Sequence, residues 1–201
     1  MVKILIHLKK QFPSLWRIIE YINGEIFKIL FSKYMYHNAD NILLEYKNEN
    51  YQYRFLSEAD IKPLNELFLR QNQEQFRFFK PHEFDINTLR RLFKNPSFLM
   101  FGVFDKSELA GYFFLRCFFN KKSFTGRIVD EKYQGKGISK RMGKILHKIA
   151  WDSNFRVFGT ASRDNFKSIN SYKTINNFKI IKELENNFIY FEYLKSEEKP
   201  L

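Results

Sequence analysis

The apolar residues near the start of the chain recur with a helical period. In residues 14–32 they fall three or four positions apart and form one stripe, which predicts an amphipathic helix. The stripe consists of Leu15, Ile18, Ile19, Ile22, Ile26, Ile29 and Leu30. Ser14, directly after Pro13, is a candidate N-cap for this helix. We expect the stripe to pack against the rest of the protein, and the alternative is an interfacial or dimerising helix.

A second pattern begins near Tyr51, after the sequence HNADN at 37–41, which is typical of a turn. Segments 58–72 and 86–94 have helical periodicity. Segments rich in aromatic and β-branched residues are separated by short polar turns, which predicts a meander of antiparallel strands. These strand segments are 51–56, 97–105, 109–119 and 124–130.

The remaining elements alternate between helix and strand. A helix is predicted from Ile138, because Ile138, Met142, Ile145, Leu146 and Ile149 form one apolar face. A strand at 155–162, a helix at 165–176 and two closing strands at 178–184 and 187–194 follow. We therefore predict an N-terminal helical extension, residues 1–50, and one domain, residues 51–201.

The net charge of +12 narrows the range of partners. Residues 1–50 are almost balanced, with seven Lys or Arg against five Asp or Glu, so the excess lies in 51–201. A basic chain suits a phosphate-bearing partner such as a nucleotide cofactor or a nucleic acid. The single cysteine, Cys117, excludes an internal disulfide, and a reducing cytoplasm is the simplest location. No apolar run reaches the length of a membrane span.

A glycine-rich turn precedes the helix at Ile138. Gly135 and Gly137 leave backbone N–H groups bare at the helix entry, where the helix dipole adds partial positive charge. No carboxylate side chain occurs between Lys132 and Trp151. This turn therefore suits a polyphosphate, although neither the Walker A spacing nor the dinucleotide fingerprint is present.

The sequence Gln134-Gly135-Lys136-Gly137-Ile138-Ser139 resembles the acetyl-CoA signature of the GNAT acyltransferase superfamily, Gln/Arg-x-x-Gly-x-Gly/Ala. The sequence NFKSINSY at 165–172 resembles that family's Asn-x-x-Ala-x-x-Leu-Tyr element. This chain departs from the family pattern at Ser139, where the family has glycine or alanine. It also lacks the family's usual glycine before Phe178.

The resemblance implies an α/β GNAT fold: a mixed, mostly antiparallel sheet splayed into a V between strands 4 and 5, with helices on both faces. It also implies that acetyl-CoA is the cosubstrate. We expect no metal, because the four scattered histidines and the single cysteine offer no metal-site spacing. The residues that match the cosubstrate-binding positions are Ile128, Val129, Gln134, Gly135, Lys136, Gly137, Ile138, Ser139, Lys140, Asn165 and Ser168.

The implied reaction is direct acetyl transfer from CoA sulfur to an amine. Tyr172 matches the position of the family's usual proton donor to the leaving thiolate. Phe79, His82 and Glu83 lie in an aromatic loop where the family often builds its acceptor site, but no general base is identified. The acceptor is expected to be an amino sugar, another small amine or a peptide amine. A non-catalytic CoA-binding domain, a nucleic-acid-binding module and a homodimer stay open.

Overall fold

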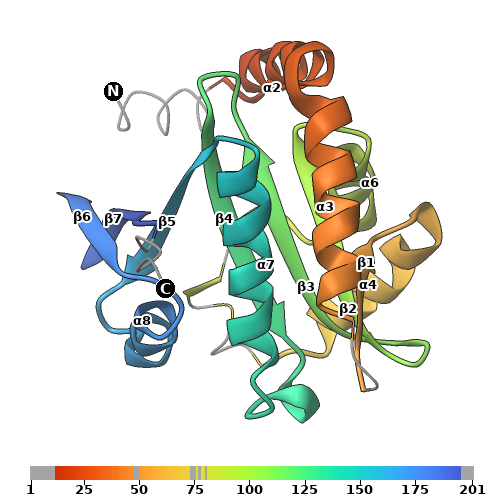
Figure 1. The fold of residues 1–201 in the computed structure, drawn as a ribbon, viewed down its shortest axis with the longest axis vertical. Coiled ribbons are helices and arrows are strands. Elements are labelled where there is room, and N and C mark those ends of the chain that lie inside the picture. The colour runs from red at the N-terminus through yellow and green to blue at the C-terminus, as the bar shows by residue number, and fades with distance from the viewer. Residues whose placement is uncertain (1–11, 48–49, 73–75, 77, 80, 196–201) are drawn as a thin grey trace, which may run out of the picture.

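The computed structural model describes residues 12–47, 50–72, 76, 78–79 and 81–195. Its centre is one seven-stranded sheet in the order β1-β2-β3-β4-β5-β7-β6 (Figure 1). Neighbouring strands are antiparallel except for β4 and β5, which are parallel. The strands are β1 Gln52–Phe55, β2 Phe98–Asp105, β3 Glu108–Cys117, β4 Lys122–Val129, β5 Arg156–Ser162, β6 Phe178–Glu183 and β7 Phe188–Tyr193.

Helices cover both faces of the sheet. On one face α3 and α7 share a core with the strands, and on the other face α4 and α6 build a second core (Figure 1). The helices are α2 Pro13–Phe27, α3 Lys33–Glu45, α4 Ile61–Leu69, α6 Ile86–Phe93, α7 Ile138–Asp152 and α8 Phe166–Lys173. A π-helical turn, Lys28–Ser32, joins α2 to α3, and single 3-10 turns span Glu58–Asp60 and Glu131–Tyr133. The predicted strands and the helices after residue 57 are confirmed.

The sheet splits along the seam between β4 and β5. The two strands pair only at Lys122–Phe124 with Arg156–Phe158, and beyond these residues they diverge. Each strand keeps its antiparallel partner on the other side, β3 for β4 and β7 for β5. The expected V between strands 4 and 5 is therefore present, and it leaves one edge of β4 unpaired.

The N-terminal helix differs from the sequence prediction. Helix α2 begins at Pro13 without a side-chain cap, so Ser14 lies within its first turn. Proline is favoured at this position because the first helical N–H has no partner inside the helix. Six of the seven residues of the predicted apolar stripe are exposed, with Ile18 at 54% and Ile29 at 80%, and only Ile26 is half-buried. The residues of α2 that are buried are Asn23, Gly24 and Phe27.

The predicted turn at 37–41 is also wrong, because these residues lie inside α3. Asn38 donates its side-chain amide to the Ile149 carbonyl and to Ser153 Oγ at the end of α7, and Ala39 is fully buried. Packing against α7 thus overrides the local turn preference of this polar segment. Helix α3 contributes to the same core as α7. The division of the chain at residue 50 stays a prediction.

Candidate functional site

A cleft of about 840 Å³ opens where β4 and β5 part. One wall is the end of β4 with the turn that leads into α7, and the opposite wall is the end of β5 with α8. The lining residues are Phe78, Phe79, Arg127, Ile128, Val129, Tyr133, Gln134, Gly135, Gly137, Ile138, Ser139, Lys140, Thr160, Ala161, Ser162, Asp164, Asn165, Phe166, Ser168, Ser171 and Tyr172. The two predicted sequence elements therefore meet across one cavity.

The glycine turn has the backbone geometry that the sequence suggested. Gly135 and Gly137 have φ angles of 77° and 74°, in the left-handed region that side chains rarely tolerate. A Cβ atom added to either glycine would meet nothing within 4 Å, so the backbone of this turn faces open space. Gly137 is the N-cap of α7, and no side chain occupies the free N–H groups there. An anion could therefore approach the start of α7 closely.

Contacts behind the cleft hold this turn in place. Asp130, directly after β4, is buried and accepts hydrogen bonds from Arg70 Nε at 2.5 Å and from the Lys132 N–H at 3.2 Å. The buried Tyr133 donates its hydroxyl to Glu108 Oε2 at 3.0 Å. Lys136 Nζ lies 4.9 Å from the centroid of the Tyr133 ring, and Lys136 does not line the cleft.

Helix α8 supplies the predicted polar face of the opposite wall. Asn165 is the N-cap of α8, and its Oδ1 accepts the Ser168 N–H at 3.0 Å. Asn165, Ser168 and Tyr172 all line the cleft, so they share one face of α8. The half-buried ring of Tyr172 packs beside Phe191 and Tyr193 of β7, with centroid distances of 5.7 and 6.0 Å.

Arg127 is a cleft residue that sequence reasoning missed. Its guanidinium carbon lies 4.8 Å from the centroid of the Tyr172 ring, and its Nε donates to Ser139 Oγ at 3.0 Å. Its Nη2 atom is buried and has no hydrogen-bond partner among the described residues. Gly143 of α7 makes room for it, because a Cβ there would lie 3.1 Å from Arg127 Nη1. The positive charge of a half-buried arginine therefore lies beside the predicted proton donor.

His147 of α7 is buried near this arginine. Its Nδ1 lies 2.8 Å from Asn176 Oδ1, and because an amide oxygen only accepts, Nδ1 carries the proton. Its Nε2 is buried without a hydrogen-bond partner in the described part of the chain. Burial is the main cause that lowers the pKa of His147 to about 4; the Asn176 hydrogen bond acts in the opposite direction, and the Arg127 charge adds to the lowering. The imidazole is therefore neutral at pH 7.

The three acceptor-site candidates do not all line the cleft. Phe79 lines the cleft, whereas His82 and Glu83 do not. His82 Nδ1 lies 2.7 Å from the Glu83 carbonyl oxygen, and its Nε2 lies 3.3 Å from the hydroxyl of the fully buried Tyr112. Tyr112 pairs across the sheet with Ile128, which is on the cleft wall. His82 thus approaches the seam from the α4 face of the sheet.

Twelve of the fifteen residues that the sequence proposed as cosubstrate, acceptor or proton-donor residues line the cleft, and Lys136, His82 and Glu83 do not. Among the described residues no cluster of His, Cys, Asp or Glu could hold a metal ion. Within the same residues, no helix has the length and apolar character needed to cross a membrane.

Comparison with solved structures places this arrangement in a known fold. RimL, a ribosomal L7/L12 alpha-N-protein acetyltransferase in complex with coenzyme A, superposes with a TM-score of 0.60 and 18% identity, covering 72% of this chain and 93% of that one. The GNAT domain of S. lividans PAT gives a TM-score of 0.62 and 12% identity, with 71% and 89% coverage. The ribosomal-protein-S5-alanine acetyltransferase from Vibrio fischeri gives 0.59 and 20%, with 77% and 98% coverage.

Comparison by sequence gives no such matches. No protein-family model matches it, and a search of curated proteins finds no match. At these identities the structural matches establish the fold alone. The α/β GNAT fold that the resemblance of the two sequence motifs implied is confirmed.

Proposed function

On the premise that the chain has the GNAT fold, we propose that it transfers an acetyl group from acetyl-CoA to a primary amine. The observation that supports this most is the meeting of two elements across one cleft. The glycine turn before α7 and Tyr172 of α8 come from separate parts of the sequence and line the same cavity. A turn that suits a phosphate and a candidate proton donor in one cavity support acetyl transfer from CoA.

The cleft has the features needed to hold acetyl-CoA. The open space at Gly135 and Gly137 and the start of α7 would receive the pyrophosphate. The edge of β4 that β5 leaves unpaired, at Ile128 and Val129, would pair with the amides of the pantetheine arm. Lys140, which is exposed on the cleft rim, adds positive charge.

Acetyl-CoA would supply an activated acyl group, and the residues of the cleft would manage protons and charge. Tyr172 would donate its hydroxyl proton to the thiolate that leaves when the carbon–sulfur bond breaks. The proton lost by the amine would return the phenolate to its neutral form. Arg127 lies beside the Tyr172 ring, so its charge would stabilise the phenolate in the interval.

The acceptor must reach the thioester as a neutral amine, although a free lysine-type amine has a pKa of about 10.4. We assign the acceptor side to the α4 face of the seam, where Phe79 lines the cleft and His82 approaches through Tyr112. The aromatic character of this side favours a small amine such as an amino sugar. A peptide amine is the second candidate, because two of the structural matches are described as acetyltransferases of ribosomal proteins.

The proposal is tested by measuring thiol release from acetyl-CoA over a panel of amino sugars, polyamines, amino acids and peptides. Tyr172→Phe should lower kcat about 10²–10⁴-fold, which is the usual worth of general acid catalysis. Acetyl-CoA should still raise the melting temperature of this variant, because only the proton donor is removed. Tyr46→Phe, a half-buried tyrosine at the end of α3, is the matched control and should retain its activity.

Each alternative gives a different result. A melting-temperature increase with acetyl-CoA but no thiol release with any amine would indicate a non-catalytic CoA-binding domain. Salt-dependent retention of DNA or RNA that acetyl-CoA does not alter would indicate a nucleic-acid-binding module. If Tyr172→Phe keeps turnover within a few-fold of the wild type, the proton comes from another group.

A further inference from the structure

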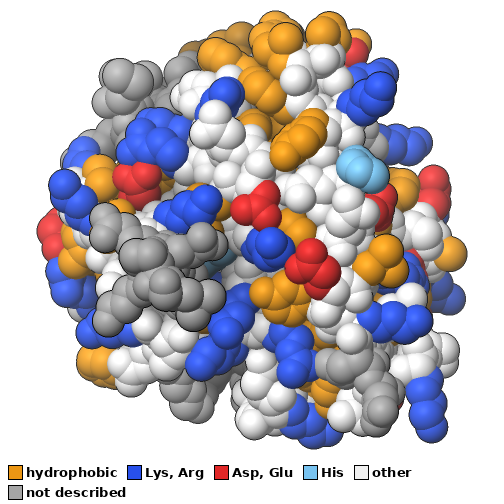
Figure 2. Space-filling view, in the orientation of Figure 1, with side chains coloured by type: hydrophobic (Ala, Val, Ile, Leu, Met, Phe, Trp, Pro, Cys, Tyr) orange, Lys and Arg blue, Asp and Glu red, His pale blue; other side chains and the backbone are white. Residues whose placement is uncertain are grey.

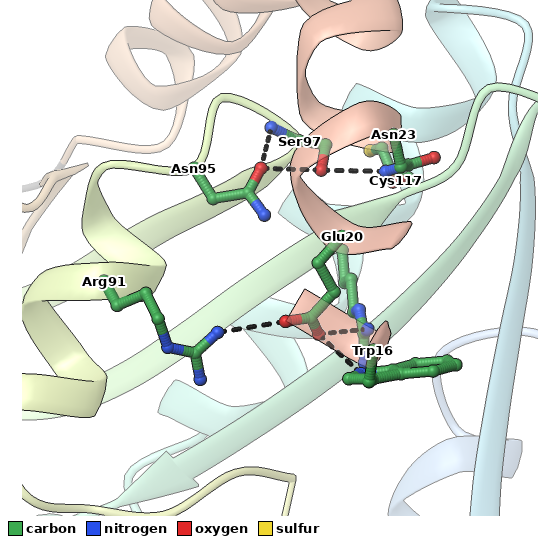
Figure 3. A network of polar contacts seen from close by, with 8 residues as sticks. Trp16, Glu20, Asn23, Arg91, Asn95, Ser97 and Cys117 are labelled. Atoms are coloured by element: carbon green, nitrogen blue, oxygen red, sulfur yellow. Dashed lines mark hydrogen bonds and ion pairs between the residues drawn. The ribbon is translucent and has the colours of Figure 1, made fainter. Parts of the chain in front are cut away.

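Helix α2 is attached to the rest of the protein through Phe27, which lies in the apolar core, and otherwise mainly through polar contacts. Glu20 lies at the centre of these contacts and accepts hydrogen bonds from Arg91 at 2.9 Å, Arg116 at 2.7 Å and the indole N–H of Trp16 at 3.0 Å (Figure 3). Arg91 belongs to α6 and Arg116 to β3. The two arginines, which come from other elements, therefore hold the face of α2 that carries Glu20 against the rest of the protein.

A second polar contact lies one turn further along α2. The Asn23 side-chain amide donates to Ser97 Oγ and to the Cys117 carbonyl, both at 2.9 Å, and its oxygen accepts the Phe119 N–H at 3.0 Å. Gly24 allows the helix to approach closely, because a Cβ there would lie 2.8 Å from Asn95 Oδ1. Buried polar groups with this many partners define one orientation of the helix.

This orientation turns the apolar residues of the helix outward. We call the exposed apolar residues of α2 and the following π-helical turn the outer stripe: Leu15, Ile18, Ile19, Ile22, Ile29 and Leu30. Phe12, Tyr21 and Tyr34 beside the stripe are exposed as well. Apolar side chains gather over α2 at the top of the molecule in Figure 2. A continuous apolar surface of this kind on a monomer usually marks an interaction site.

A basic hollow adjoins the outer stripe. It has a volume of about 380 Å³ and is lined by Glu25, Lys28, Ser32, Lys33, Tyr36, Lys94 and Pro96. We call it the lysine hollow. Its three lysines are exposed, and none forms an ion pair with a described carboxylate. Glu25 alone opposes them, so the hollow attracts anions.

We propose that the outer stripe and the lysine hollow together dock this protein on an anionic lipid membrane. A helix that lies in the membrane interface buries an apolar face at the acyl boundary, while nearby lysines contact acidic headgroups. A second copy fits the charges less well, because a two-fold interface would bring two lysine hollows to the same contact. Helix α2 lies at the opposite end of the molecule from α8, so docking leaves the cleft away from the bilayer (Figure 1).

The test is flotation of the full chain with vesicles of pure phosphatidylcholine or of phosphatidylcholine with phosphatidylglycerol. The wild type should float with the anionic vesicles. The triple variant Lys28→Gln, Lys33→Gln, Lys94→Gln should bind them about 5-fold more weakly for each lysine removed. Ile22→Glu with Ile29→Glu should lower binding at least about 10-fold, because apolar burial is replaced by charge. Both variants alter exposed residues, so melting temperatures should be kept.

Matched controls change the same residue types elsewhere on the surface. Leu44→Glu on α3, where Leu44 is 70% exposed, and Lys179→Gln with Lys182→Gln on β6 should leave flotation unchanged. The proposal is overturned if the wild type does not float with anionic vesicles, or if the stripe variants float equally well. It is also overturned if the stripe variants convert a dimer into a monomer without changing flotation, or if the chain floats only after deletion of residues 1–11.

Discussion

Burial of His147 should make the stability of this protein depend on pH. In the folded protein the imidazole is 1% exposed, and its Nε2 has no hydrogen-bond partner among the described residues. Protonation would place a positive charge there, between the rings of Trp151 and Tyr193 and close to Arg127. The imidazole of His147 therefore binds a proton more weakly in the folded protein than in the unfolded chain.

The magnitude follows from the two pKa values. The pKa of His147 is about 4 in the folded protein, against an ordinary value of 6.5. Above pH 6.5 neither state holds the proton, and between the two values only the unfolded state does, so stability falls as pH falls. The free energy of unfolding should decrease by about 1.4 kcal/mol per pH unit, reaching on the order of 3 kcal/mol in total.

Denaturant unfolding between pH 7.5 and pH 4.5 measures this slope. His147→Gln removes the titration but keeps a side-chain donor for Asn176, so the variant should lose most of the decrease. His37→Gln, at an exposed position on α3, is the control and should follow the wild type. Equal pH dependence in the wild type and in His147→Gln would refute the reasoning, because the slope would then arise from other groups.

Two further predictions concern the cleft. Gly137→Val should abolish most of the melting-temperature increase that acetyl-CoA causes, because valine is strained at a φ of 74° and fills the open space there; an unchanged increase would place the phosphate site elsewhere. Arg127→Met should lower kcat about 2- to 30-fold through loss of the contact with Tyr172, with acetyl-CoA affinity little changed. A matching loss of affinity would instead make Arg127 a binding residue.

The features that were predicted correctly are mainly those that local sequence patterns determine. The face of α7 from Ile138 to Ile149 is buried as its period indicates, and Gly135 and Gly137 adopt the positive φ angles that glycine permits. The closing strands also form, although the expected glycine before Phe178 is missing. The apolar period and the positions of the glycines are properties of residues that lie only a few positions apart in the chain.

The features that were missed depend on partners far away in the chain. The period of α2 shows which residues are apolar, but its orientation is set by Glu20 with Arg91 and Arg116, 71 and 96 positions away. Similarly, the sequence around Arg127 is typical of a strand residue that faces solvent. Only the structure shows that Gly143 of α7 leaves space for the guanidinium of Arg127. A polar residue inside an apolar helical period, such as Asn23, is the one local signal that could have indicated the inward face.

The narrow contact between β4 and β5 has a consequence for how the molecule opens. Only three residue pairs join β1–β4 to β5–β7 through backbone pairing, so the seam is a natural boundary between cooperative unfolding units. We expect the unit formed by β5, β6, β7 and α8 to open at a lower free energy than the whole fold, with the apolar core that it shares with α7 as the main remaining contact. A ligand that contacts both walls of the cleft links the two units. Binding of such a ligand should therefore make β5, β6, β7 and α8 more rigid, and its release should make them less so.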